Sequence, residues 1–442
     1  MGFSYFPHTA ADIGEILKRI GVDGLDDLYA DVPRSVIFDG DYDLPDAMSE
    51  MEVRRRFEEL DRKNRHLTIM AGGGAYDHYA PAVVPALTSR SEYLTAYTPY
   101  QAEISQGTLR YIFEFQSMIA TLTGMDCANA SMYDGATAAA EAMMMAMAAT
   151  RKKTRVLLSS TLLPQVREVV HTYAKYHGVE LSEIASADGQ TDIDDARRLL
   201  EAGDVAGVLV PSVNRFGIVE DLSGFAEAAH AQKALLMVYA DPSALAVVRT
   251  PGEWGADVAC GDAQTLGIPL GFGGPYVGFL ACSKEHVRKL PGRIVGATTD
   301  VDGKRAFVLT LQAREQHIRR EKANSNICSN QSLMALYVTI YLSLMGKKGL
   351  RQVCDLSYGA AHYLHDRLIE TGLFSEAFNR PFLKEFALHT DIPADRLQQA
   401  LLDGGFFGAL PTEEGLVTFC ATERRTREEI DRMIDLIKQI QL

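Results

Sequence analysis

The chain has 442 residues, and 58 Asp and Glu against 44 Lys and Arg give it a formal net charge of −14. This negative balance argues against nucleic acid or an anionic membrane surface as the main partner. Hydrophobic residues make up 47% and charged residues 23%, which is typical of a globular protein, and the length predicts either two or three domains or one large α/β domain with a smaller one attached.

The six cysteines are scattered and include no CxxC pair, which predicts free thiols in a reducing compartment. No basic segment followed by an apolar one opens the chain, so we expect no signal peptide. The longest apolar-rich run, 136–149, is broken by Glu141 and is too short to span a bilayer. His362 and His365 have metal-compatible spacing but no third ligand. These patterns predict a cytoplasmic protein without a membrane segment or a metal site.

The first 60 residues predict a helical arm. A helix capped by Thr9 or Asp12 is expected to extend to Ile20, with apolar residues at helical spacing. Two further short helices follow, and the second of them, over 44–62, is highly charged on one face.

Residues 67–105 combine a glycine run with aromatic residues and prolines, which is typical of loops. From Gln106 a helix with a broad apolar face is expected, and Gly124 ends it. Beyond Met125 the sequence alternates between amphipathic helices and short apolar strands, which predicts an open, mostly parallel, doubly wound sheet. From about Asn330 long helices and short strands predict a smaller α+β domain.

One stretch of the sheet region is similar to the lysine segment of a pyridoxal-phosphate (PLP) enzyme. It runs from Gly255 to Gly278 and follows a strand that ends on Asp241. A PLP enzyme needs a carboxylate to pair with the pyridinium nitrogen and an amine to form a Schiff base. Asp241 is a candidate for the carboxylate, but the amine position reads Asp262-Ala263-Gln264-Thr265, and glutamine forms no Schiff base. Because ligands of such sheets bind beyond the carboxyl ends of the strands, we expect Asp241, Asp262 and Gln264 at that edge.

Three other segments can each be interpreted either as functional or as purely structural. The helix that begins at YDGATAAAEAM has a glycine at its N-terminus, which suits a phosphate, although close packing of small residues is the favoured interpretation. AREQHIRREKANSNIC is either a solvated helix or a cationic wall for an anionic substrate. TAYTPYQAEISQG carries many hydrogen-bonding side chains on an irregular segment, so it is either functional or the ordered arm of a dimer.

Several long motifs, in order, resemble one family. They are GGGAYDHYAP, YTPYQAEISQG, LTGMDCANASMYDGATAAAEAM, PLGFGGPYVGF, LPGRIVGAT and LQAREQHIRREKANSNIC. Together they resemble the P-proteins of the glycine cleavage system (glycine decarboxylase), specifically the N-terminal half or subunit 1. The resemblance implies a fold-type-I PLP-dependent transferase-like α/β fold. It further implies an N-terminal arm and interface segment over 1–124, a large doubly wound domain over 125–329 and a small C-terminal α+β domain over 330–442.

The same resemblance implies that the Schiff-base lysine belongs to the second half of the P-protein. The counterpart of that lysine in this chain is Gln264. Lys284, the next lysine, is expected to be an exposed surface residue. The chain alone would then have no catalytic residue and hold no PLP covalently, the cofactor being held by the partner subunit. With that subunit, in an α2β2 complex, it would decarboxylate glycine and transfer the aminomethyl group to the lipoyl arm of the H-protein, as an oxidoreductase of the glycine dehydrogenase type.

The resemblance also implies candidate site residues. A first set is expected to reach into the partner's pocket: Tyr97, Tyr100, Gln101, Glu103, Ser105 and Gln106. Arg314 and His317 are expected at that interface or at the phosphate end, and Ser325 and Asn326 are candidates for binding the cofactor in trans.

Two alternatives remain beside this interpretation. The chain is either a stand-alone PLP-dependent aminotransferase or decarboxylase that uses another lysine, or a purely structural or regulatory homologue. Gln264 argues against the first alternative. The intact YTPYQAEISQG and REQHIRR segments argue against the second.

Overall fold

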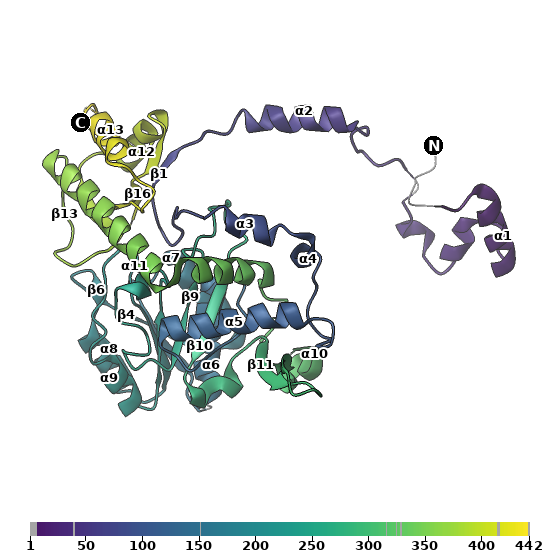
Figure 1. The fold of residues 1–442 in the computed structure, drawn as a ribbon, viewed down its shortest axis with the longest axis horizontal. Coiled ribbons are helices and arrows are strands. Elements are labelled where there is room, and N and C mark those ends of the chain that lie inside the picture. The colour runs from purple at the N-terminus through teal and green to yellow at the C-terminus, as the bar shows by residue number, and fades with distance from the viewer. Residues whose placement is uncertain are drawn as a thin grey trace. The chain divides into compact units, whose positions relative to one another are not determined.

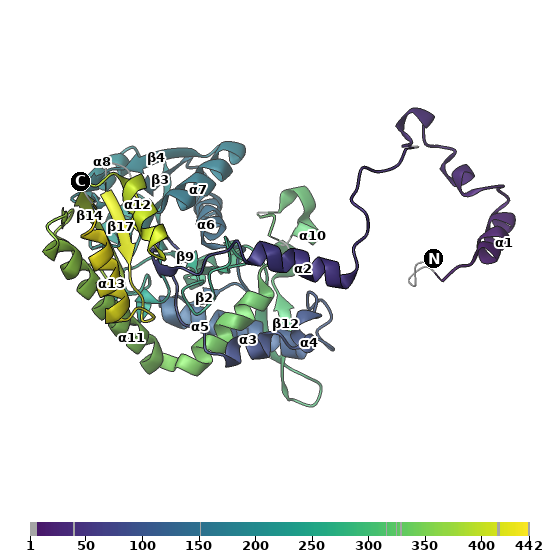
Figure 2. The same ribbon diagram turned by 90° about the horizontal axis from the view of Figure 1, so that it is seen from above.

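The chain divides into two compact units, Met1–Arg65 and His66–Leu442, in the computed structural model (Figures 1 and 2). The structure describes residues 7–38, 40–150, 152–314, 316–323, 325–327, 329–412 and 416–440. The side chains of Arg314 and His317 lie outside the described part of the chain.

The first unit consists of short helices. Helix α1 (Ala10–Ile20) begins at Thr9, whose side chain accepts a hydrogen bond from the backbone of Asp12, and ends at Gly21 in the left-handed conformation, as expected. Two single 3-10 turns follow, at Leu25–Tyr29 and Arg34–Val36. Helix α2 (Glu50–Asp61) is shorter than the predicted 44–62, because Ser49 and Glu52 form a capping box that fixes its start.

The second unit is built around a seven-stranded sheet. Its strand order is β2-β10-β9-β8-β7-β3-β4, and β10 is antiparallel to both of its neighbours while β9, β8, β7, β3 and β4 are mutually parallel. The strands are β2 (Cys127–Ala128), β10 (Gly278–Cys282), β9 (Val258–Asp262), β8 (Leu235–Tyr239), β7 (Val205–Pro211), β3 (Arg155–Ser159) and β4 (Glu180–Ile184). The predicted open, mostly parallel sheet is confirmed.

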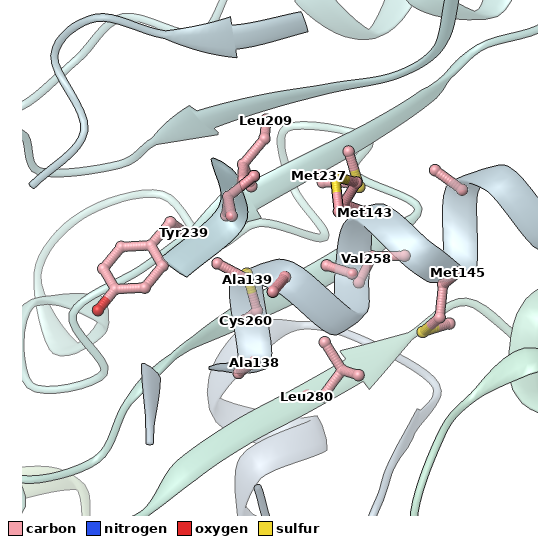
Figure 3. Packing of buried hydrophobic residues seen from close by; sticks show 14 of the residues in the cluster. Ala138, Ala139, Met143, Met145, Leu209, Met237, Tyr239, Val258, Cys260 and Leu280 are labelled. Carbon is pink, nitrogen blue, oxygen red and sulfur yellow. The ribbon is translucent and has the colours of Figure 1, made fainter. Parts of the chain in front are cut away.

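Helices cover both faces of this sheet. Helices α6 (Gly135–Thr150) and α7 (Pro164–His177) pack on one face, where alanines and methionines of α6 contact Met237, Cys260 and Leu280 (Figure 3). On the other face, α8 (Ile193–Leu200) and α9 (Phe225–Ala231) cover β7 and β8, while α5 (Gln106–Thr123) and the first half of α11 cover β9 and β10. The small side chains of α6 let it approach the sheet closely.

The C-terminal part forms a second layered structure. Helix α11 (Ser332–Glu370) is interrupted at Gly346, whose φ of 56° and ψ of −174° are not helical, so the two predicted consecutive helices meet at this residue. The second half of α11, with α12 (Ala394–Asp403) and α13 (Arg427–Ile437), covers a four-stranded sheet. That sheet has the order β13 (Phe374–Glu376), β14 (Glu385–Thr390), β17 (Leu416–Cys420), β16 (Leu410–Pro411).

Smaller elements complete the second unit. Strand β1 (Thr68–Met70) pairs in parallel with β15 (Phe406–Gly408), so the segment after the arm is anchored in the C-terminal part. An antiparallel hairpin follows the main sheet and was not predicted from the sequence; its strands are β11 (Ile294–Thr299) and β12 (Arg305–Thr310). The remaining α-helices and strands of the described ranges are α3 (Val83–Thr88), α4 (Ser91–Leu94), β5 (Ser186–Ala187), β6 (Gln190–Thr191) and α10 (Gln316–Arg319). Within the described ranges, no helix is long and apolar enough to cross a membrane, and no group of three metal-ligating side chains is present.

Candidate active site

Acidic side chains stand at the carboxyl edge of the main sheet, as predicted. Asp262 is the last residue of β9, and Asp241 follows β8 by two residues. The Asp262 carboxylate accepts hydrogen bonds of 2.9 Å from the backbone N–H groups of Gly135 and Gln264. Gly135 is the first residue of α6, so the Asp262 carboxylate occupies the helix N-terminus, the position that suits a phosphate. Burial raises the pKa of Asp262 to about 7.

Gly135 lets the start of α6 pack closely against the edge of the sheet. A Cβ added there would lie 2.6 Å from the Tyr239 hydroxyl and 2.7 Å from the backbone nitrogen of Asp262. The glycine is therefore needed for the close approach of α6 to the sheet edge. Packing of small residues, the favoured sequence interpretation, agrees with this geometry.

Gln264, at the expected position of the Schiff-base lysine, is fully buried and fully hydrogen-bonded. Its Oε1 accepts from the Tyr76 N–H at 2.8 Å, and its Nε2 donates to the carbonyl oxygens of Tyr76 at 2.8 Å and Ile268 at 2.7 Å. The Gln264 side-chain amide thus exchanges hydrogen bonds with the backbone of the loop that carries Tyr76, in the way that the backbone of an adjacent β-strand would. This side chain holds the 71–80 loop over the sheet edge.

Asp241, the candidate partner for a pyridinium nitrogen, is already paired with a cation of the same chain. The Lys384 ammonium lies 2.7 Å from Asp241 Oδ2, and Lys384 directly precedes β14 of the C-terminal part. Asp241 Oδ1 accepts from the hydroxyls of Ser243 and Thr265, both at 2.8 Å. Burial alone would raise the pKa of Asp241, but the Lys384 charge and these hydrogen bonds hold it below its usual value.

The Lys384 ammonium uses all three of its protons inside the protein. Besides Asp241, it donates to Ser243 Oγ at 2.8 Å and to His78 Nε2 at 3.0 Å, and it lies 4.0 Å from the centre of the Tyr76 ring. Burial and the neighbouring Lys384 charge lower the pKa of His78, and the contact with the Lys384 ammonium makes Nε2 the acceptor of the ring. Its Nδ1–H donates to Glu423 at 2.7 Å.

A second buried carboxylate fixes the loop above this ion pair. Glu385 accepts from the Tyr76 hydroxyl and from the Gly73 N–H, both at 2.7 Å. Burial raises the pKa of Glu385. At Gly72 a Cβ would lie 2.5 Å from Glu385 Oε1, which explains a glycine of the GGGAYDHYAP motif. Tyr76, Glu385 and Lys384 therefore fill the space between the sheet edge and the C-terminal part.

The remaining cavity at the sheet edge is small. Its volume is about 20 Å³, and its walls include Gly74, Tyr76, Asn214, Asp241 and Asp262. A volume of this size holds about one water molecule, whereas small-molecule sites occupy roughly 300–1,000 Å³. With Gln264 in place of a lysine and Asp241 neutralised by Lys384, the residues present do not fit PLP.

The residues predicted to reach a partner differ in their exposure: some face solvent, and others make contacts within the chain. Tyr97 and Tyr100 are 76% and 50% exposed, and their ring centres lie 6.5 Å apart. The Tyr100 hydroxyl lies 3.4 Å from Arg293, a buried residue whose guanidinium also contacts the Tyr100 ring. Gln101 and Glu103 are exposed. The loop therefore presents two tyrosines and two polar side chains to solvent, next to a buried arginine.

Gln106 has a structural role within the chain, whereas the Ser105 side chain makes no capping hydrogen bond to α5. Ser105 precedes α5, and the Gln106 side chain pairs with the backbone of Phe307 on β12 through bonds of 2.9 Å in both directions. Gln106 thereby fixes α5 to the β11–β12 hairpin. Glu103 and Gln106 line an open groove of about 730 Å³ between α5 and the hairpin, whose other walls include Arg110 and Arg305.

The second predicted set lies after the hairpin. The Ser325 hydroxyl donates to Glu141 on α6 at 2.7 Å, and Asn326 is exposed. Burial raises the pKa of Glu141 to about 7. Arg314 and His317 belong to short helical turns, and their side chains lie outside the described part of the chain. No contact of this structure tests their predicted roles.

The sequence interpretation missed the cation that neutralises Asp241. The predicted strand FLKEFALHT contains Lys384 and Glu385 side by side among apolar residues, and both are buried. Two adjacent charges in an otherwise apolar strand were the available signal, because strand neighbours point to opposite faces and only one face can be solvated.

The chain is similar in sequence to known proteins over nearly its whole length. The family model described as "Glycine cleavage system P-protein" matches residues 3–437. A curated relative from Moorella thermoacetica, named "Probable glycine dehydrogenase (decarboxylating) subunit 1", is 49% identical over 99% of both chains. A relative of the same name from Desulforamulus reducens is 48% identical over 97% of both chains.

Solved structures agree with the family match. A crystal structure of glycine decarboxylase (P-protein) of the glycine cleavage system, in inhibitor-bound form, matches with a TM-score of 0.92 at 43% identity and covers 99% of this chain and 100% of that one. Lactobacillus brevis glutamate decarboxylase matches with a TM-score of 0.69 at 13% identity over 91% of this chain and 96% of that one, which shows the shared fold. The predicted fold-type-I architecture is thus confirmed, and the chain belongs to the family of glycine cleavage system P-proteins.

Proposed function

We propose that this chain is the subunit of a two-chain glycine decarboxylase that does not hold the cofactor. The observation that carries the proposal is Gln264, a fully buried and fully hydrogen-bonded amide at the position expected for the Schiff-base lysine. The Lys384–Asp241 ion pair supports it, because it removes the carboxylate that would bind a pyridinium nitrogen. A stand-alone PLP enzyme, the first alternative, needs both groups.

The reaction is inferred from the relatives. Their names, glycine dehydrogenase (decarboxylating) subunit 1, denote one member of a set of subunits. We assign PLP, which supplies the electron sink for decarboxylation, to the second subunit, and we infer an α2β2 assembly in the cytoplasm. The aminomethyl product would pass to the lipoyl arm of the H-protein. This chain would form one wall of the site and exclude water from it.

Reconstitution tests this function. We expect the purified chain to show no PLP absorbance band and no glycine–CO2 exchange, and the second subunit to reach full exchange only when this chain is added. An imine band from this chain alone would contradict the proposal. Full exchange by the second subunit without this chain would favour a structural or regulatory homologue.

The Tyr97–Gln106 segment is the part of the chain that we propose to reach the partner's site. Tyr97 is 76% exposed although it is a large aromatic residue, and exposed aromatic residues are frequent at energetic centres of interfaces. The Arg293 guanidinium packs against the ring of the neighbouring Tyr100. Arg314, His317, Ser325 and Asn326 remain weaker proposals for the same interface or for binding the cofactor in trans.

Tyr97→Ala is expected to lower glycine–CO2 exchange of the reconstituted complex by at least about tenfold, which corresponds to about 1.4 kcal/mol. The unfolding midpoint of the free chain should not change, because an exposed side chain contributes little to folding. Tyr176→Ala is the matched control, since Tyr176 is 77% exposed on α7. Equal exchange rates for the two variants would remove the segment from the site.

A further inference from the structure

Two glutamines of α5 bind the β11–β12 hairpin, one on each edge. The Nε2 of Gln116 donates to the Val295 carbonyl oxygen at 3.0 Å, and its Oε1 accepts from the Val295 N–H at 2.9 Å. Gln106 forms the same pair of bonds with Phe307 on the other strand. A strand residue bound in this way turns its backbone groups away from the partner strand, so the hairpin has one glutamine amide on each outer edge.

The hairpin depends on α5 for its order. A two-stranded hairpin alone is marginally stable in water. Val295 and Phe307 are buried in one cluster with Leu109 and Ile112 of α5, beside which the hairpin lies (Figure 1). Gln116 is buried as well, so a strand that shifted along the helix would leave its amide and the Val295 backbone without partners. Gln116 therefore fixes the register of β11 on α5.

The strand that Gln116 fixes begins directly after Arg293. Arg293 is buried, and its guanidinium lies 5.5 Å from the centre of the Tyr100 ring. One guanidinium nitrogen lies 3.4 Å from the Tyr100 hydroxyl, and another lies 3.3 Å from the side-chain oxygen of Asn330. A shift of β11 along α5 would therefore displace the guanidinium from the Tyr100 ring.

Gln106 fixes the other end of the loop that contains Tyr100. It is the first residue of α5, and its Nε2 also donates to the Ala102 carbonyl oxygen at 2.7 Å. Residues 97–105, named the tyrosine loop from here on, therefore lie between two fixed points, the Arg293 guanidinium and the start of α5. A loop that is already ordered loses less conformational entropy when its side chains contact a partner.

We propose that Gln116 is a positioning residue for the reaction of the two-chain complex. It fixes β11, β11 holds Arg293 against the Tyr100 ring, and Tyr100 thereby keeps one orientation toward the partner's site. The inference rests on the function proposed above, in which the tyrosine loop reaches that site. A misplacement of about 1 Å of a group that orients reacting molecules can lower a rate by about 100-fold.

Amide hydrogen exchange of the free full-length chain tests the link from Gln116 to the tyrosine loop. Gln116→Met removes both bonds to Val295 while keeping a side chain of similar length. The amides of Tyr100, Ile104 and Ser105 are hydrogen-bonded within the loop. We expect Gln116→Met to raise their exchange rates by at least about fivefold, because the loop loses one of its fixed points. Unchanged rates in this variant would overturn the proposal.

Two further variants make this measurement specific. Gln398→Met is the matched control, since Gln398 lies on α12 and donates to the Ala409 backbone carbonyl at 3.2 Å in the C-terminal part. It should leave the exchange rates of the tyrosine loop within about twofold. Arg293→Lys covers the case in which Gln116→Met does not fold, because it keeps the buried charge and loses only the planar contact with Tyr100. A tyrosine loop that stayed equally protected in Arg293→Lys would also overturn the proposal.

Glycine–CO2 exchange of the reconstituted complex distinguishes positioning from general stability. We expect Gln116→Met to lower the rate by at least about tenfold in the unchanged chain, and by less than about twofold in a chain with Tyr100→Ala, where the residue it acts on is already truncated. Equal fold losses in the two backgrounds would assign Gln116 to stability alone and overturn the proposal. Full exchange by the second subunit without this chain would instead refute the two-chain function.

Discussion

Lys384→Met is expected to lower the free energy of unfolding by about 3–5 kcal/mol, the usual cost of removing one member of a buried ion pair. The substitution leaves Asp241 buried with only hydroxyl and backbone donors, and it removes the ammonium that donates to Ser243 and His78. The apolar part of Met fills a similar volume, so the loss comes from the uncompensated charge rather than from a cavity. Chemical unfolding monitored by circular dichroism measures it.

The pH dependence of this deficit separates charge from packing. In the unchanged chain the depressed pKa of Asp241 gives stability that is present above the unfolded value of about 4 and is lost as the pH falls. Without Lys384, burial raises that pKa, so the penalty grows as the pH rises above about 4. The difference between the two proteins should therefore be largest at neutral pH and shrink toward pH 4. A deficit independent of pH would contradict the charge argument.

Two further variants complete this test. Lys284→Met is the control, because Lys284 is exposed, as predicted from the sequence, and should change stability by less than about 0.5 kcal/mol. Asp241→Asn combined with Lys384→Met removes both charges and should recover part of the loss. If Lys384→Met unfolded like Lys284→Met, the ion pair would not stabilise the fold.

Gln264→Lys, which restores the missing amine to the sequence, is expected to yield no Schiff base with PLP. The cavity of about 20 Å³ has no room for the cofactor, and Asp241 is neutralised by Lys384. The variant should also lose about 2–4 kcal/mol of stability, because the Tyr76 N–H loses its acceptor and a second ammonium is buried at the sheet edge. Absorbance after addition of PLP, and mass after borohydride reduction, measure the adduct.

Gln264→Met serves as the control for this substitution. It removes the same hydrogen bonds without adding a charge, so the difference between the two variants isolates the cost of the buried cation. A stoichiometric PLP adduct at the substituted position would show that the 71–80 loop leaves the sheet edge readily. That outcome would contradict our description of Gln264 and Tyr76 as a fixed contact.

Local sequence patterns predicted the parts of the site that depend on chain order. Strand ends carry Asp241, Asp262 and Gln264 to one edge because parallel strands point the same way, and the absence of a lysine there was visible in the sequence. The capping pattern at Thr9 also gave the start of α1 correctly. Helix α2 was predicted too long, because Leu44-Pro45 resembles a helix start and Ser49 provides a better cap.

The contacts that fill the site depend on tertiary structure. Lys384 reaches Asp241 from a different layer of the fold, and a lysine in a strand is usually solvated, so its partner could not be inferred from sequence spacing. The insertion of Tyr76 is likewise a long-range contact, made by Gln264 and Glu385 together. The Gln106 contact with β12 was missed because the β11–β12 hairpin itself was not predicted.

The Lys384 side chain acts as a tethered ligand of Asp241. A diffusible cofactor stabilises a fold to a degree that depends on its free concentration. A cation on the same chain has a fixed effective concentration, so occupancy of this pocket does not vary with the cofactor supply of the cell. Under the function proposed above, we therefore expect the free energy of unfolding of this polypeptide to be independent of the PLP concentration.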